Sequence, residues 1–140
     1  MLTSIGLWLA PLIASKGSRL LREHPDWFVK DTLTLEPMSS DSETFGGWRD
    51  APWYALDACH PQVLAHLEGL FRYFRETWHV RYFKLDALFW GALHNGARYS
   101  DTCTRIEAYR LGMKAMRRGA PGMLTYADVC LCMLTYAGVC

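Results

Sequence analysis

The sequence predicts an α/β fold with parallel strands, and three observations support this prediction. Unbroken apolar runs stand near the start and the middle of the chain, as in strands buried on both faces. Two longer segments carry apolar residues at three- and four-residue spacing, which is typical of amphipathic helices. The order strand, helix, strand, helix then favours a βαβ unit in a parallel sheet.

The composition is that of one ordinary globular domain. The chain has 140 residues, of which 51% are hydrophobic and 14% aromatic, and this excludes a disordered chain. Its formal net charge of +1 gives no electrostatic argument for a nucleic-acid partner. The set of six Trp, seven Tyr and six Phe fits a large core and fits stacking on sugar rings equally well.

Signals for secretion, membrane insertion and metal binding are weak. Residues 1–14 are apolar, but no basic residue precedes them and Pro11 interrupts the run, which argues against a signal peptide. No stretch approaches the roughly 20 apolar residues of a membrane-spanning helix. The five cysteines form no paired Cys-x-x-Cys motif, so we expect no zinc site and reduced thiols in a cytoplasmic protein. They are Cys59, Cys103, Cys130, Cys132 and Cys140.

The first strand is predicted over residues 5–10, because Pro11 cannot donate to a ladder. Ser15 is the expected cap of a short helix over residues 18–24, which ends before a proline. Residues 26–30 are expected to form a small accessory strand.

A polar segment rich in turn formers covers residues 31–51. Loops of this length are uncommon inside compact domains and often form active-site walls. Trp48 and Trp53 stand at its far end, where they either pack against the loop or offer a stacking platform. Residues 53–57 then predict a short strand that ends in the carboxylate of Asp57.

A long helix is predicted to begin at His60-Pro61, with proline at a permitted first-turn position, and to end near His79. We expect one apolar stripe of this helix to face the core. The stripe consists of Val63, Leu64, Leu67, Leu70, Phe71 and Phe74.

The strand that begins at Val80 ends in two charged residues, Lys84 and Asp86. Side chains two positions apart in a strand share a face. A charge taken out of water needs a partner or a task. The pair therefore fits a site that binds and attacks a polar ligand, and it fits a buried ion pair equally well.

A flexible loop over residues 91–96 is followed by a second long helix over residues 101–118. Gly119 is its natural stop, and basic residues at its C-terminal end complement the helix dipole. The basic residues are Lys114, Arg117 and Arg118, and the expected inner stripe is Ile106, Tyr109, Met113 and Met116.

Two parallel-sheet architectures fit this order of elements. A doubly wound nucleotide-binding sheet needs a glycine-rich turn from strand to helix, and the sequence shows no such pattern. A (β/α)8 barrel carries its catalytic residues at the C-terminal ends of strands, where Asp57 and Asp86 stand. We therefore favour a partial (β/α)8 TIM barrel over residues 1–120.

The tail over residues 121–140 is anomalous. Residues 123–130 recur almost unchanged as residues 133–140, with Gly138 in place of Asp128. One duplication is too few for a solenoid. The tail is either an apolar strand that replaces the fifth strand of a barrel, followed by its copy, or an artefact of the sequence.

Five motifs in order resemble the melibiase-type α-galactosidases of glycoside hydrolase family 36. They are residues 6–14, 18–20, 24–27, 54–63 and 82–93, and they cover roughly residues 6–118. The resemblance implies a TIM-barrel segment from about the third strand to the fourth helix.

The resemblance also implies retaining hydrolysis of terminal α-D-galactosides, with an α-galactoside oligosaccharide or glycoside as ligand and no metal or cofactor. Asp86 matches the catalytic nucleophile that closes the fourth strand. Lys84 matches a lysine that contacts sugar hydroxyls and helps keep the carboxylate ionised. Trp8 falls on a third-strand motif close to the sugar pocket, although its side chain could equally face the core.

In that family the acid/base aspartate belongs to the sixth strand, so we expect it outside this chain. A complete barrel takes about 250 residues. Asp128 is not a substitute, and Asp57 is expected to cap the helix at Pro61 or to lie at the edge of the pocket.

Two other functions stay open. The neighbouring α-glucosidase families share a similar barrel with an aspartate at the same strand end. A non-catalytic sugar-binding or assembly module needs a closed small fold. A partial barrel instead leaves open sheet edges that favour association. A homo-oligomer is a separate expectation for the full-length parent.

Overall fold

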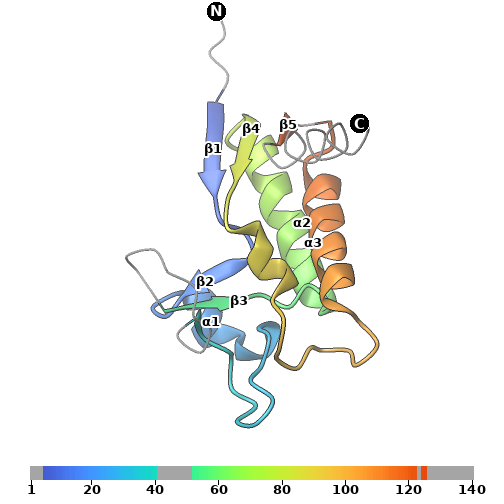
Figure 1. The fold of residues 1–140 in the computed structure, drawn as a ribbon. Coiled ribbons are helices and arrows are strands. Elements are labelled where there is room, and N and C mark those ends of the chain that lie inside the picture. Colours follow the sequence, from blue (N-terminus) through green and yellow to red (C-terminus); the bar gives the residue numbers. More distant parts are fainter. Residues whose placement is uncertain (1–4, 41–51, 123, 126–140) are drawn as a thin grey trace, which may run out of the picture.

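The computed structural model describes residues 5–40, 52–122 and 124–125. In this part of the chain, β1 (Ile5–Leu9), β4 (Val80–Leu85) and β5 (Leu124–Thr125) form a sheet in the order β1-β4-β5 (Figure 1). Both pairings in this sheet are parallel. The predicted α/β class with parallel strands is confirmed by this sheet.

A second sheet pairs β2 (Ile13–Ser15) with β3 (Trp53–Ala55), and this pairing is antiparallel. The prediction that the strand over residues 53–57 belongs to the parallel sheet is therefore wrong. The cause is the turn at Pro11, which divides one apolar run into two strands that join different sheets.

Two short elements differ from their predictions. Ser15 ends β2, and Ser18 caps α1 (Arg19–Glu23), where its Oγ accepts from the Leu21 N–H at 3.2 Å. The predicted accessory strand over residues 26–30 is wrong. Pro25–Trp27 forms a 3-10 helix, and the residues that follow it make isolated bridges only.

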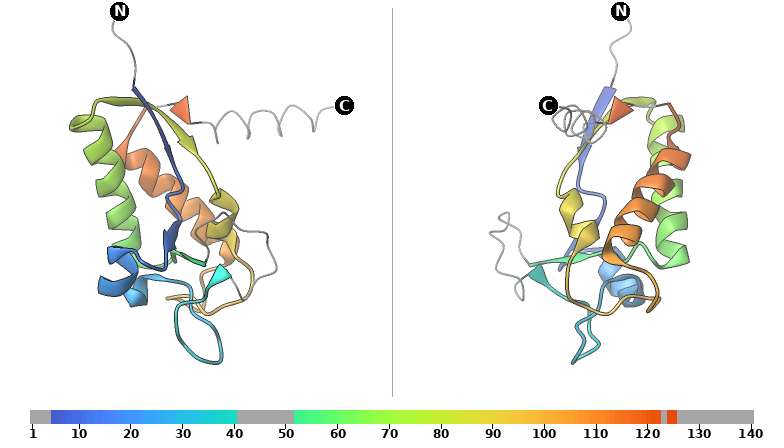
Figure 2. Two further views of the ribbon diagram at one scale, coloured as in Figure 1. Left: turned by 90° about the vertical axis from the view of Figure 1, so that its left-hand side faces the viewer. Right: turned by 45° about the vertical axis from the view of Figure 1, so that its right-hand side comes forward.

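The helices α2 (Pro61–Glu76) and α3 (Arg105–Gly119) lie side by side on one face of the parallel sheet (Figure 2). The helix α2 and its apolar stripe are confirmed, because Val63, Leu67 and Phe71 are buried. The His60 imidazole caps this helix, since Nδ1 accepts from the Gln62 N–H at 3.1 Å.

The buried face of α3 is shifted from the predicted stripe. Ile106 is 53% exposed, whereas the buried residues are Ala108, Gly112, Ala115, Met116 and Gly119. A Cβ atom on Gly119 would collide with the carbonyl oxygen of Glu68 on α2. The face of small residues thus allows α3 to approach α2 closely. This close packing decides which face of α3 is buried, whereas the spacing of its larger side chains predicted a different face.

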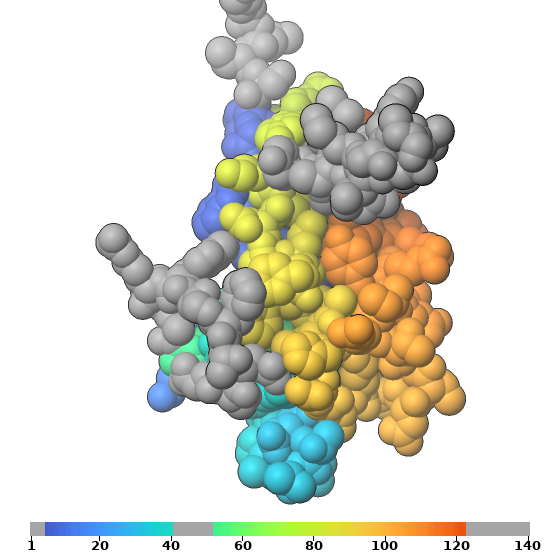
Figure 3. All heavy atoms as spheres, in the orientation of Figure 1, coloured from blue at the N-terminus to red at the C-terminus, as the bar shows by residue number. Residues whose placement is uncertain are grey.

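The two faces of the parallel sheet differ in burial. Phe83 and Leu85 are buried on the helix side, where the Phe83 ring lies 4.7 Å from that of Phe71. Ile5 and Trp8 remain 53% and 51% exposed, so the prediction that the first strand is buried on both faces is wrong. In the described residues α2 and α3 cover one face only, and atoms of β1 and β4 reach the surface (Figure 3).

Trp53 belongs to a second apolar cluster at the β2–β3 sheet. It is 5% exposed, and its ring meets that of Trp90 edge-on at 5.6 Å. Its role is therefore packing, and the alternative of a stacking platform is wrong for this residue. Trp48 and residues 41–51 of the predicted loop lie outside the described residues.

Little of the tail is described. Leu124 and Thr125 pair with Tyr82 and Phe83 of β4, which places them beside the strand that carries the predicted site. The duplicated segments and Cys130, Cys132 and Cys140 otherwise lie outside the described residues, as do residues 1–4.

Three histidines gather around Trp27. The His24 ring stacks on it at 4.0 Å, and the rings of His66 and His60 lie at 5.5 and 6.4 Å. Burial lowers the pKa of His66, and the charge of His24 lowers it further. The Asp26 carboxylate faces His60, with 3.6 Å between Oδ2 and Nε2.

We expect His66 to make stability fall as the pH is lowered. The pKa of His66 lies below its unfolded value, so the unfolded chain binds more protons and the unfolding free energy rises with pH. The contribution is complete above the ordinary histidine pKa of about 6.5 and is lost as the pH falls through the folded value. Urea titrations between pH 7.5 and 5 should show a shallower pH slope for His66→Gln.

His79→Asn is the matched control, because His79 is exposed and away from Trp27. An equal pH slope in wild type and His66→Gln would show that His66 does not couple stability to pH.

Candidate active site

The register between β1 and β4 brings the predicted site residues onto one face. Trp8 is the partner of Lys84, and the Asp86 N–H donates to the Leu9 carbonyl at 2.9 Å, one residue beyond β4. Because alternate residues share a face, Lys84 and Asp86 point to the side opposite the buried Phe83 and Leu85.

The Asp86 carboxylate accepts a hydrogen bond on each oxygen. The Trp8 indole Nε1–H donates to Oδ2 at 3.1 Å, and the Ala87 N–H donates to Oδ1 at 2.8 Å. Trp8 therefore does not face the core, which was one of its two predicted orientations. The carboxylate is half-buried and remains accessible from the open face.

Lys84 is exposed, and no ion pair joins it to Asp86 in the described part of the chain. The alternative that the two charges form a buried ion pair in the sheet is wrong. The Lys84 side chain instead lies on the open face, at the position paired in register with Trp8 of the neighbouring strand. Polar ligands such as sugar hydroxyls can reach both charges from this side.

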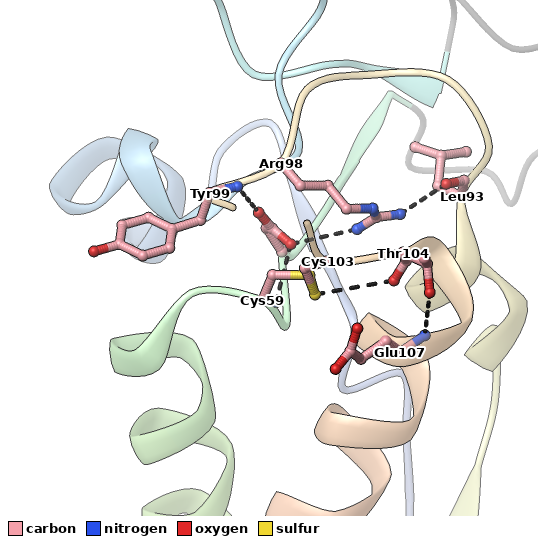
Figure 4. Close-up of polar contacts among 8 residues, drawn as sticks. Cys59, Leu93, Arg98, Tyr99, Cys103, Thr104 and Glu107 are labelled. Carbon is pink, nitrogen blue, oxygen red and sulfur yellow. Dashed lines mark hydrogen bonds and ion pairs between the residues drawn. A yellow bond between two sulfur atoms is a disulfide. The ribbon is translucent and has the colours of Figure 1, made fainter. Parts of the chain in front are cut away.

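Asp57 has a structural role away from this face. It is 1% exposed and accepts from Arg98 Nη1 at 3.3 Å, the Tyr99 N–H at 2.6 Å and the Cys59 N–H at 3.0 Å (Figure 4). The expectation that it caps α2 is wrong, because the His60 imidazole caps that helix. The hydrogen bonds of its carboxylate instead connect the segment before α3 to the start of α2.

A disulfide reinforces the same junction. Cys59 and Cys103 are bonded, with Cα atoms 6.2 Å apart across 44 residues of sequence. The expectation of reduced cysteines is wrong for this pair. A disulfide that closes a loop of this length stabilises the fold by roughly 4 kcal/mol, because it lowers the entropy of the unfolded chain. The expectation of a cytoplasmic location rested on reduced thiols, and the disulfide removes that support.

Other kinds of site have little support in the described residues. No three His, Cys, Asp or Glu side chains among them lie close enough to hold a metal ion. A surface hollow lined by His94, Arg98, Asp101 and Arg105 lies beside the disulfide, and Asp86 does not line it. None of the described helices has the length and apolar character needed to cross a membrane.

Comparison with known proteins points to one group of enzymes. No family model matches the chain. The α-galactosidase of Thermus thermophilus in complex with stachyose is 28% identical, with a TM-score of 0.68 over 87% of this chain. The α-galactosidase of Lactobacillus brevis and the family 36 α-galactosidase of Geobacillus stearothermophilus are 24% and 19% identical, with TM-scores of 0.56 and 0.57 over 87% of this chain.

The similarity covers only part of each of these enzymes. The chain spans 24% of the length of the Thermus enzyme and 16% of each of the other two. For those two the similarity concerns the fold alone. The structure of the chain thus fits a fragment of the catalytic domain of family 36 α-galactosidases.

Proposed function

We propose that this chain carries the nucleophile strand of a retaining α-galactosidase, within a (β/α)8 barrel segment from the third strand to the fourth helix. The observation that supports this proposal best is the Asp86 carboxylate. It stands at the C-terminal end of a parallel strand, is reachable from the open face, and is oriented by two donors. Functional carboxylates of barrel enzymes occupy such strand ends.

The proposed reaction proceeds in two steps. The Asp86 carboxylate attacks the anomeric carbon, the bond from that carbon to the leaving oxygen breaks, and a second carboxyl group protonates this oxygen. The same second group then takes a proton from water, which attacks the anomeric carbon and releases Asp86. The exposed Lys84 ammonium is suited to donate hydrogen bonds to sugar hydroxyls.

The proposed substrate class is a terminal α-D-galactoside. Support comes from the Thermus enzyme, which binds stachyose and p-nitrophenyl α-D-galactopyranoside. In retaining enzymes the acid/base carboxyl group lies about 5 Å from the nucleophile. Asp57 is held by the Arg98 pair instead, and we place the acid/base residue on a part of the barrel outside this chain.

A chimeric barrel tests this function. Residues 5–120 would replace the matching segment of the Thermus α-galactosidase, to which the chain is 28% identical. We expect the chimera to hydrolyse p-nitrophenyl α-D-galactopyranoside and to prefer it to the α-glucoside, and we expect no turnover by the chain alone. The measurement is the release of nitrophenol.

Each other outcome points to a different function. Preference of a folded chimera for the α-glucoside would favour an α-glucosidase-type hydrolase. A chain that runs as a monomer in gel filtration and binds galactose by itself would favour a non-catalytic sugar-binding module. Turnover by the chain alone would show that its own residues supply the acid/base group.

A further inference from the structure

We propose that Trp8 is a positioning residue that holds the Asp86 carboxylate through its indole N–H. This inference rests on the proposed function, in which Asp86 is the nucleophile. It differs from the role that the sequence indicated for Trp8, which was contact with the sugar.

The hydrogen bond joins two strands that are far apart in the sequence. Trp8 and Asp86 are separated by 78 positions, and Nε1 lies 3.1 Å from Oδ2. The backbone beneath them is fixed by the parallel register and by the Asp86 N–H, which donates to Leu9 at 2.9 Å. Trp8 and Asp86 therefore both lie on backbone that is hydrogen-bonded to the neighbouring strand.

The other oxygen is held by a turn directly after the strand. Ala87 has φ 52° and ψ 29°, a left-handed conformation that costs a non-glycine residue about 1 kcal/mol. In this conformation its N–H donates to Oδ1 at 2.8 Å. With one donor on each oxygen, rotation of the carboxylate about its Cβ–Cγ bond breaks both hydrogen bonds.

The chemistry of indole limits what Trp8 can do at this position. Its N–H is a donor only, so it takes no proton during the reaction. When one Asp86 oxygen forms the ester with the sugar, the other keeps its donor, whether that donor is Trp8 or Ala87. Holding a nucleophile in its attack geometry is a recognised source of rate acceleration.

Nuclear magnetic resonance on the chain itself tests this role without sugar or turnover. We expect hydrogen exchange of the Trp8 indole N–H to be about fivefold slower in wild type than in Asp86→Ala, since a hydrogen bond worth about 1 kcal/mol must open first. Asp86→Asn should restore slow exchange, because its amide oxygen still accepts. Trp8→Phe identifies the resonance by its disappearance.

The orientation of Asp86 supplies the second measurement. Side-chain couplings should show one χ1 rotamer for Asp86 in wild type and rotamer averaging in Trp8→Phe. Tyr82→Phe is the matched control, because Tyr82 is exposed on β4 and makes neither hydrogen bond to Asp86. It should leave the rotamer unchanged.

Two results would overturn the proposal. One is equal exchange of the Trp8 N–H in wild type and Asp86→Ala, and the other is a single Asp86 rotamer in folded Trp8→Phe. The hydrogen-exchange comparison uses wild type and Asp86→Ala, which both contain Trp8. It can therefore be made even if Trp8→Phe does not fold. A negative result in either measurement does not change the conclusion from the activity of the chimera. An inactive chimera likewise does not change the conclusion from these two measurements.

Discussion

The Asp86→Asn substitution is expected to lower turnover of p-nitrophenyl α-D-galactopyranoside by the chimeric barrel by a factor on the order of 10³ or more. The amide of asparagine is neutral and a poor nucleophile, so the glycosyl ester does not form. The substitution keeps the size of the side chain and an oxygen acceptor for the Trp8 and Ala87 donors. Loss of activity therefore reports on chemistry rather than on folding.

A small external nucleophile tests the role of Asp86 in a second way, which does not depend on how much activity the substitution removes. In Asp86→Gly the space of the carboxylate is open, and azide can attack the anomeric carbon from the same side. We expect added azide to restore cleavage and to give the β-galactosyl azide, because attack from that side inverts the configuration. Tyr82→Phe serves again as the control on the same face and should retain most of the activity.

Turnover of Asp86→Asn close to that of the unmodified chimera would remove Asp86 from the role of nucleophile. The same conclusion would follow if a folded Asp86→Gly chimera released the nitrophenol rapidly without azide.

Local patterns were sufficient to predict β4, whose open face carries Lys84 and Asp86, and α2, which covers the opposite face of the sheet. The stripe of α2 repeats with the period of the helix, so Val63, Leu67 and Phe71 could be assigned to the core directly. The spacing of Lys84 and Asp86 placed both on one face of β4. The sequence did not indicate that this face is open, because unbroken hydrophobicity suggests burial on both sides.

Contacts between distant residues could not be predicted in the same way. Asp57 and Arg98 are 41 residues apart, and the two bonded cysteines are 44 apart, so no local pattern links them. The packing of α3 did leave a signal. Its small residues Ala108, Gly112, Ala115 and Gly119 recur at spacings of four and three, which marks a close helix–helix contact.

The arrangement of the candidate site residues was predicted in part. The strand-end carboxylate was predicted from spacing and from the family resemblance, and its donor Trp8 was predicted as a site residue with another role. The Ala87 N–H was missed because a left-handed alanine has no signature in the sequence. A backbone donor of this kind can be identified only from the conformation of the turn in the structure.

The Asp57→Ala substitution is expected to have the largest effect on stability, with a loss of about 3–5 kcal/mol in the free energy of unfolding. The side chains of Asp57 and Arg98 are 2% and 7% exposed, so removing the carboxylate leaves a buried guanidinium without its counter-charge. The Tyr99 and Cys59 N–H groups lose their acceptor as well. The measurement is urea unfolding with the disulfide intact.

A matched comparison separates burial from charge. Glu68 pairs with Arg118 at 2.8 Å on the surface, where water replaces a lost partner, so Glu68→Gln should leave the urea midpoint almost unchanged. The double variant Asp57→Ala/Arg98→Met should recover much of the loss, because it removes the stranded charge together with its partner. If Asp57→Ala unfolds at the same urea concentration as Glu68→Gln, the Asp57–Arg98 pair does not hold the segment before α3 to the start of α2, and the disulfide alone makes that junction.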